Sequence, residues 1–318
     1  MLKSILVPIP KNRKKSLNES SNYRSIAISS IIGKIFDHVI LSKFSDVLIT
    51  TDLQFGFKKK HSTTQCTFVL NEIVDYYNQR QTPVFTALLD SSRAFDRVHY
   101  VKLSNLLLKR GMCPALIKFI IFMYISQSLC VRWNSKTSSL FECNNGIKQG
   151  GVLSPILFCI YMDELLIRLK SSRVGCHVGH VFCGALTYAD DITLLAPTHS
   201  AMSEMLRICE QFASEYHVLF NSSKSHMLFF SPRANARNNN CRPFYLNGNH
   251  INYVDKALHL GTYVGKGAHE ANVKKICSDI YCKTNMLFST FKYCSPDVIC
   301  SLFKSYCTSF FWLAPVET

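Results

Sequence analysis

Two acidic sites stand out in a chain that contains few acids. Asp90 ends the largely apolar run at residues 84–89, and Asp190 and Asp191 lie inside a second apolar stretch, residues 186–195. An acidic pair flanked by apolar strands is costly unless its charge is compensated. Carboxylate oxygens suit Mg²⁺, and carboxylates from two strands can hold two ions for in-line phosphoryl displacement. The alternative is that Asp190 and Asp191 simply form a hairpin turn, where Asp is common.

A glycine-containing segment, residues 146–155, is the next candidate for chemistry. Gly150 and Gly151 permit close approach of the backbone to a ligand, a strand or a base. Gln149 beside them supplies a hydrogen-bonding side chain. Ser154 and Pro155 predict the start of a helix that runs to about residue 170. Each of these features is weak by itself.

Alternating strands and helices are predicted around these residues. Residues 84–89 have the composition of a buried strand, and residues 186–195 that of a hairpin. Apolar spacing and end signals predict further helices near residues 31–44, 62–77, 100–110, 114–127 and 201–216, and two between 269 and 311. Ser62 is the expected N-cap of the second of these helices. Strands are predicted near residues 4–8, 129–133, 140–144 and 227–230, and a polar loop at residues 233–242.

Charge and composition narrow the class of protein. The chain has 318 residues, of which 47% are hydrophobic and 18% charged, so a disordered chain is excluded. It carries 36 Lys and Arg against 21 Asp and Glu, a formal charge of +15. A folded chain this basic suggests a polyanionic partner, with nucleic acid ahead of an anionic membrane surface.

Cysteine spacing and hydropathy give no further site. The 14 cysteines form no Cys-x-x-Cys pair, and free thiols in a reducing compartment are expected. Residues 176–183 contain two Cys and two His, but they alternate like a strand and match no common zinc spacing. The longest apolar stretch, residues 117–131, is too short to span a bilayer, so no transmembrane segment is predicted.

Taken together, the motifs resemble the reverse transcriptase domain of non-long-terminal-repeat (LINE-like) retrotransposons, of the jockey and chicken-repeat kind. The sequence departs from the usual pattern at Ser25, where the family has Pro, and at Arg93, where it has Lys. Neither position is a metal ligand in the family. The matching segments, in family order over about residues 5–265, are 22–26, 54–57 with Ser62 and Thr63, 88–96, 146–155, 188–191 (Tyr-Ala-Asp-Asp), 221–225 and 258–261.

The resemblance implies an α+β fold of the right-hand polymerase type. Residues 1–264 would form the reverse transcriptase domain, with fingers at about 1–83 and palm at about 84–264. Residues 265–318 would form partial, thumb-like helices. The family's longer polyproteins imply that this chain is a fragment or a truncated copy of an element.

The resemblance also implies an RNA-directed DNA polymerase and assigns roles to residues. Asp90, Asp190 and Asp191 would be catalytic carboxylates and, with the main-chain carbonyl of Ser91, would bind two Mg²⁺ ions, for which Mn²⁺ could substitute. The expected substrate-binding residues are Arg24 at the triphosphate, Phe95 as a steric gate beneath the sugar, Gln149 at the nucleotide, Gly150 near the template and Lys224 at the departing pyrophosphate.

Three of these residues also have an ordinary structural explanation. Arg24 could be an exposed loop arginine, Phe95 a core residue and Lys224 a solvated lysine. Lys58 and Arg80, with other basic residues, are expected to contact backbone phosphates.

The expected partners are an RNA template, a DNA primer and deoxynucleoside triphosphates, with no membrane; protein partners and the choice between nucleus and cytoplasm stay open. Two other functions remain as alternatives to an RNA-directed DNA polymerase. One is a catalytically inactive, nucleic-acid-binding remnant. The other is an RNA-dependent RNA polymerase, against which Phe95 argues.

Overall fold

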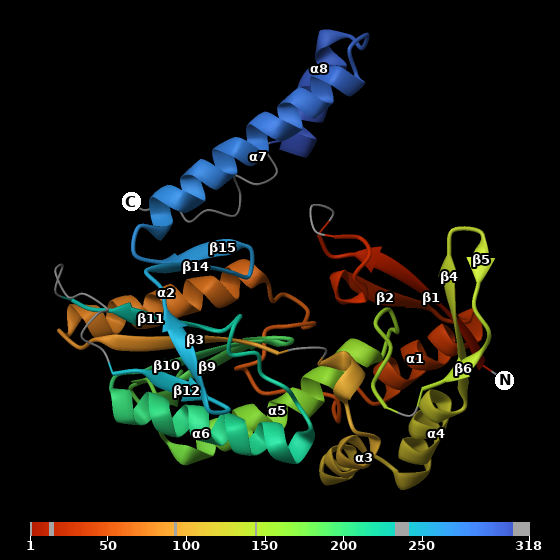
Figure 1. Ribbon diagram of the computed structural model, residues 1–318, viewed down its shortest axis with the longest axis horizontal. Helices are drawn as coiled ribbons and strands as arrows, with labels where there is room; N and C mark the ends of the chain where they lie inside the picture. Colours follow the sequence, from red (N-terminus) through yellow and green to blue (C-terminus); the bar gives the residue numbers. More distant parts are fainter. Residues whose placement is uncertain (1, 13–15, 92–93, 144, 233–241, 308–318) are drawn as a thin grey trace.

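Two main sheets organise the chain in the computed structural model, which describes residues 2–12, 16–91, 94–143, 145–232 and 242–307. A six-stranded sheet with flanking helices forms one half of the molecule, and a smaller sheet with its own helices forms the other (Figure 1). A helical arm projects away from both (Figure 1).

The six-stranded sheet has the strand order β12-β13-β11-β3-β10-β9. Its central strand β3 pairs antiparallel with both β10 and β11. The pair β11–β13 is parallel, whereas β9–β10 and β12–β13 are antiparallel. The strands are β3 (Val84–Asp90), β9 (Ala185–Tyr188), β10 (Asp191–Ala196), β11 (His226–Phe230), β12 (Phe244–Leu246) and β13 (Asn249–Tyr253).

Both faces of this sheet are covered, which explains the almost continuous apolar sequence of β3. Side chains alternate across a strand, so Ala87 and Leu89 face one layer while Val84 and Leu88 face the other. The first layer contains α5 (Ser154–Ser172) and α6 (His199–Tyr216). The second contains α2 (Thr63–Gln79) and the hairpin β14 (Lys256–His259) and β15 (Thr262–Gly265).

The smaller sheet joins segments that are far apart in sequence. β1 pairs antiparallel with β2 and parallel with β4, with Leu2 opposite Gln127. Strands β5 and β6 both pair with β4. The elements are β1 (Leu2–Pro10), β2 (Tyr23–Ile28), β4 (Gln127–Trp133), β5 (Lys136–Thr137) and β6 (Phe141–Glu142), with α1 (Ile31–Lys43), α3 (Tyr100–Lys109) and α4 (Pro114–Ile125) nearby (Figure 1).

The arm consists of α7 (Ala268–Thr290), α8 (Pro296–Leu302) and a π-helical turn, Phe303–Cys307. Leu287 is the buried residue of α7. The remaining short elements are the 3₁₀ helices Ser20–Asn22 and Phe95–Arg97 and the hairpin of β7 (His177–Val178) with β8 (Val181–Phe182).

Most of the expected elements are present, with local differences at their ends. Ser62 caps α2 as expected, because its hydroxyl accepts the N–H of Gln65. Ser154 is the first residue of α5 rather than its cap, and its hydroxyl instead contacts Tyr124. The expected polar loop at 233–242 lies almost wholly outside the described residues. Within the described part of the chain, no helix is long and apolar enough to cross a membrane.

The division into fingers, palm and thumb at residues 83 and 264 stays a prediction. Strands β4 to β6, which fall inside the expected palm range, belong to the smaller sheet, where β4 pairs with β1 and β5 and β6 pair with β4. Helix α2, which falls inside the expected fingers range, packs against β3 and β9 of the larger sheet.

Candidate active site

Strand pairing brings the acidic residues to one end of the six-stranded sheet. Asp90 ends β3, Asp191 begins β10, and the two are directly opposite in the antiparallel pair. Opposite residues of such a pair project from the same face, so both lie on the face covered by α2 and the β14–β15 hairpin. Asp190 sits in the turn between β9 and β10, and the Ser91 hydroxyl donates a hydrogen bond of 3.0 Å to its carbonyl oxygen.

The electrostatics of these carboxyls follow from burial and from their closeness. Burial, together with the charges of Asp190 and Asp90, raises the pKa of Asp191 to about 6, while Arg24 opposes the rise. Burial likewise raises the pKa of Asp190, with Asp90 adding to the effect and Arg24 again opposing it. The site therefore concentrates negative charge that the protein compensates only in part, which is the property expected of a cation-binding site.

Two basic side chains lie near this charge. Arg24 is exposed on β2, in the smaller sheet, and its charge lowers the pKa of Asp190 and Asp191 in the larger sheet. The Nζ of Lys224 lies 3.9 Å from Oδ2 of Asp90, with the two side chains 64% and 37% exposed. An exposed pair at this distance contributes little to stability, so Lys224 remains available to another anion.

The segment at residues 221–225 fixes the backbone of Asp90. The N–H of Asn221 donates to the carbonyl of Asp90 at 2.9 Å. The N–H of Asp90 donates to Oγ of the buried Ser225 at 3.1 Å. Sequence reasoning noted this segment as a motif but missed the role of Ser225, because nothing local indicates a contact across 135 positions.

The loop that carries Gln149 and Gly150 is held by the smaller sheet and its helix. The N–H of Ala27 in β2 donates to the carbonyl of Gln149 at 2.6 Å. Gly150 has a φ of 107°, and a Cβ there would lie 2.8 Å from the Ala27 carbonyl oxygen. The chain itself therefore requires glycine at 150, and close approach of a template is a separate prediction that stays open.

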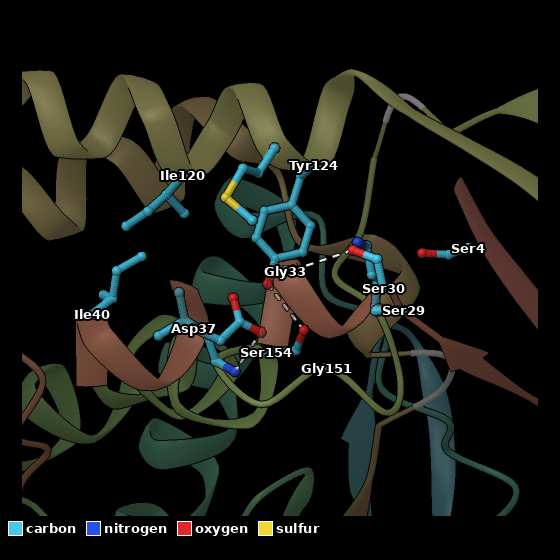
Figure 2. A pocket seen from close by; sticks show the side chains of 13 residues that line it. Ser4, Ser29, Ser30, Gly33, Asp37, Ile40, Ile120, Tyr124, Gly151 and Ser154 are labelled. Carbon is cyan, nitrogen blue, oxygen red and sulfur yellow. Dashed lines mark hydrogen bonds between the residues drawn. The ribbon is translucent and has the colours of Figure 1, made fainter. Parts of the chain in front are cut away.

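A half-buried carboxylate anchors the other end of this loop (Figure 2). Oδ2 of Asp37, in α1, accepts the N–H groups of Val152 and Leu153, each at 3.2 Å. These N–H groups stand at the start of α5, where a helix has unsatisfied donors, so Asp37 acts as a cap supplied by another helix. Sequence reasoning missed Asp37, which it counted only within an amphipathic helix.

Phe95 is half-buried and stacks on a core residue. Its ring centroid lies 4.3 Å from that of Phe158, which is fully buried. Its carbonyl accepts the N–H of Ile147, in the loop that precedes Gln149. Phe95 thus has a packing role in the protein alone, and the steric-gate role stays a prediction.

Two basic residues expected at phosphates are engaged within the chain. Nζ of Lys58 donates to the carbonyls of Thr50 and Thr51, and burial lowers its pKa. The guanidinium of Arg80 stacks over Tyr76, 3.6 Å from the ring centroid, and donates to the Tyr76 carbonyl.

The acidic residues of this site suit the expected metal ions in chemical type. Carboxylates are the right chemistry for Mg²⁺, and a bound cation would offset both the burial and the mutual repulsion that raise the pKa of Asp190 and Asp191. Among the described residues, however, no three His, Cys, Asp or Glu side chains already meet as a metal cluster. The residues thus fit the ions in kind, and the side chains would have to converge on them.

One known protein family matches most of this chain. Residues 9–264 match the family described as reverse transcriptase (RNA-dependent DNA polymerase). The chain belongs to the reverse transcriptase family.

The relatives of this reverse transcriptase chain are polymerases of LINE-like, non-long-terminal-repeat elements, as the sequence motifs indicated. It is 24% identical over 203 residues to the Pol polyprotein of the retrotransposable element R2DM of Drosophila melanogaster, covering 64% of this chain and 19% of the relative. It is 25% identical over 260 residues to the RNA-directed DNA polymerase of the mobile element jockey of Drosophila melanogaster, covering 78% and 27%. The chain thus spans about a fifth to a quarter of the length of these relatives.

Solved structures support the fold of this reverse transcriptase. Telomerase from Candida albicans, in complex with a fragment of telomeric RNA, has a TM-score of 0.54 at 11% identity and covers all of this chain and 56% of its own. Apo telomerase from Candida tropicalis has a TM-score of 0.54 at 10% identity, over 83% and 47%. At such identities the likeness concerns the fold alone, which is that of a right-hand polymerase.

Proposed function

We propose that this chain is an RNA-directed DNA polymerase that extends the 3′-hydroxyl of a DNA primer along an RNA template. The observation that carries the proposal is the register that sets Asp90 opposite Asp191 with Asp190 in the adjoining turn. Membership of the reverse transcriptase family and relatives named RNA-directed DNA polymerases support the choice of reaction.

Asp90, Asp190 and Asp191, together with the main-chain carbonyl of Ser91, would hold two Mg²⁺ ions, or Mn²⁺ in their place. Such ions lower the pKa of an attacking hydroxyl and neutralise a departing pyrophosphate. The chain's own contribution is to fix the backbone of Asp90 through Asn221 and Ser225 and to place Asp191 beside it.

The remaining residues would receive the substrates. Arg24 is exposed and electrostatically coupled to Asp190 and Asp191, so it is placed to attract the triphosphate. Lys224, beside Asp90, would balance the charge of departing pyrophosphate. Gln149 would contact the nucleotide from a loop held by Ala27 and Asp37, Gly150 would lie near the template, and Phe95 would close the space beneath the sugar.

The test is primer extension on an RNA template with deoxynucleotides and Mg²⁺. Template-dependent extension by the wild-type chain supports the proposal, and efficient use of ribonucleotides would favour an RNA polymerase instead. Salt-sensitive binding of the hybrid without any incorporation would overturn the proposal in favour of an inactive nucleic-acid-binding remnant.

A further inference from the structure

The chain at residues 53–56 forms an extra, strand-like contact along β9. The N–H of Phe55 donates to the carbonyl of Thr187 at 2.8 Å, and the N–H of Thr187 donates to the carbonyl of Leu53 at 2.9 Å. Gln54 pairs with Thr187 as an isolated parallel bridge. This contact brings the segment to the edge of the strand that leads into the acidic turn.

The side chain of Gln54 reaches that turn directly. Its Oε1 accepts the N–H of Ala189 at 3.0 Å and the N–H of Gly56 at 2.8 Å. Gln54 is fully buried, and within the described part of the chain its Nε2 has no hydrogen-bond partner. The stabilising contribution of this side chain therefore comes through its oxygen.

Ala189 is a position where the backbone needs support. Its φ is 58°, a left-handed conformation that is unfavourable for a residue with a Cβ. It lies between Tyr188, which ends β9, and Asp190. A hydrogen bond that holds the Ala189 N–H consequently fixes the direction in which the chain presents Asp190 and Asp191.

Close packing at Gly56 gives the same relation a second, independent support. A Cβ on Gly56 would lie 2.5 Å from the backbone nitrogen of Ala189. Gly56 has no positive φ, so an alanine would suit its backbone, and the obstacles are the Ala189 backbone and, at 3.0 Å, the Oε1 of Gln54. The segment and the turn are thus in contact both by hydrogen bonding and by shape.

The segment is itself anchored from behind by a buried acid. Asp163, on α5, is 1% exposed. Its Oδ1 accepts the N–H and the hydroxyl of Thr51, at 3.0 and 2.7 Å, and its Oδ2 accepts from Arg110 at 2.6 Å. Thr51, three residues before Gln54, is therefore anchored to the core by hydrogen bonds. This anchoring restricts the position from which Gln54 contacts the turn.

We propose that Gln54 is a positioning residue that sets the Ala189–Asp191 turn for catalysis, an inference that rests on the proposed polymerase function. It acts through the turn and touches neither substrate nor metal ion. Removing its oxygen should leave the fold in place while the turn explores conformations in which Asp190 and Asp191 are misplaced. Such misplacement lowers turnover, whereas hybrid binding depends on other surfaces.

The experiment compares Gln54→Met with Gln211→Met, which makes the same change at an exposed position of α6. For Gln54→Met we expect a fall in kcat of about tenfold to a hundredfold. The KM for primer–template should be unchanged. Hydrogen exchange of the Ala189 N–H should be about fivefold faster or more, as for loss of one buried hydrogen bond. Gln211→Met should match wild type in all three measurements.

The outcomes separate this inference from the proposed function. If the wild-type chain extends primers and Gln54→Met retains wild-type kcat, the positioning role is wrong although the polymerase function stands. If the wild-type chain is inactive, the polymerase function fails, and unchanged exchange at Ala189 in Gln54→Met would then overturn the positioning role as well.

A second variant covers the case in which Gln54→Met fails to fold. Gly56→Ala keeps the Gln54 side chain but places a methyl group 2.5 Å from the Ala189 nitrogen and 3.0 Å from the Oε1 of Gln54, so it disturbs the same contact from the other side. We expect the same fall in kcat with unchanged KM for primer–template. Wild-type turnover in Gly56→Ala would show that the turn tolerates displacement and would overturn the proposal.

Discussion

The surroundings of Asp190 in the fold disfavour its ionised form. Asp190 lies half-buried in the β9–β10 turn, where burial raises its pKa and the nearby charge of Asp90 adds to the rise. We expect Asp190→Asn to reduce incorporation at least about a hundredfold, because a metal-binding charge contributes several kcal/mol to the transition state. Folding and hybrid binding should persist, since the substitution preserves shape.

The measurement is single-nucleotide incorporation, with melting temperature and hybrid affinity as controls. Asp75→Asn, at an exposed position on α2, is the matched control and should behave as wild type. Incorporation by Asp190→Asn at the wild-type rate with Mg²⁺ would remove Asp190 from the site.

Phe95 combines two roles that a single substitution can separate. Its stack on Phe158 predicts that Phe95→Val costs about 1–3 kcal/mol of stability. If the ring also occupies the volume of a 2′-hydroxyl, the variant should admit ribonucleotides while retaining deoxynucleotide use, because overlap in a packed site has no soft escape.

The ratio of incorporation efficiencies for matched deoxy- and ribonucleotides, beside a melting curve, tests both roles. Phe122→Val, at a residue 64% exposed on α4, controls for the loss of a ring and should change neither quantity much. An unchanged ratio with a lowered melting temperature would leave Phe95 as a core residue only.

If the paired strand ends of β3 and β10 bind Mg²⁺ as proposed, stability should depend on pH and on Mg²⁺ together. The raised pKa of Asp191, about 6, means that the folded chain holds this proton more tightly than the unfolded chain does. Without metal, this group therefore favours folding at low pH and loses that contribution as pH rises through about 6. A cation bound at the ionised carboxyls should offset the loss.

We expect Mg²⁺ to raise the melting temperature more at about pH 7.5 than at about pH 5, by the linkage between proton and metal binding. Asp191→Asn should remove much of this difference. Equal stabilisation by Mg²⁺ at both pH values, or an effect that Asp191→Asn leaves intact, would contradict binding at these strand ends.

The junction between α1 and α5 depends on Asp37. Asp37→Ala would leave the N–H groups of Val152 and Leu153 without their acceptor, at a cost of about 1–2 kcal/mol, the usual cost of a lost helix cap. The loop with Gln149 should loosen, so we expect the KM for deoxynucleotide to rise. Asp37→Asn keeps one acceptor oxygen and should lose less on both counts.

Melting temperature and steady-state nucleotide kinetics on the two variants check this prediction. A lowered melting temperature with unchanged KM would show that the cap supports α5 but does not govern the position of Gln149.

Local sequence patterns were sufficient to predict the helices and strands. They were not sufficient to predict which residues these elements contact across the fold. The apolar run before Asp90, the hairpin around Asp190 and the cap at Ser62 were all predictable because their signals lie within a few residues. The parallel pairing of Leu2 with Gln127, the cap that Asp37 gives Val152 and the grip of Gln54 on Ala189 each join residues more than a hundred positions apart. No local spacing encodes such contacts.

Gly150 shows that a residue of a family motif can be required by the fold alone. Gly150 was noted for a motif in which a template approaches, yet the structure already demands glycine there because of the Ala27 carbonyl. The hypothesis that carboxylates from two strands hold two ions required those strands to lie together, and β3 does pair with β10. The supporting residues Ser225 and Gln54 could be assigned only once those strands were seen together.

Over the whole molecule, we expect net charge and a lightly packed arm to govern how nucleic acid is held. The formal charge is +15, and α7 buries only Leu287 among its 23 residues (Figure 1). Affinity for primer–template should consequently depend mainly on phosphate contacts, so the logarithm of the binding constant should fall steeply and linearly with the logarithm of salt concentration. An arm with so few buried contacts gives a weak grip on a duplex, and we expect distributive synthesis.

Extension of a labelled primer, started together with an excess of unlabelled hybrid as a trap, measures this directly. Short products from one binding event, and a salt dependence equal in wild type and Asp190→Asn, are the expected results, because the metal ligand contributes no phosphate contact. Long products in the presence of the trap would mean that α7 and α8 close on the duplex despite their sparse packing. In that case the hybrid itself would supply the contacts that order the arm, and affinity would become less sensitive to salt.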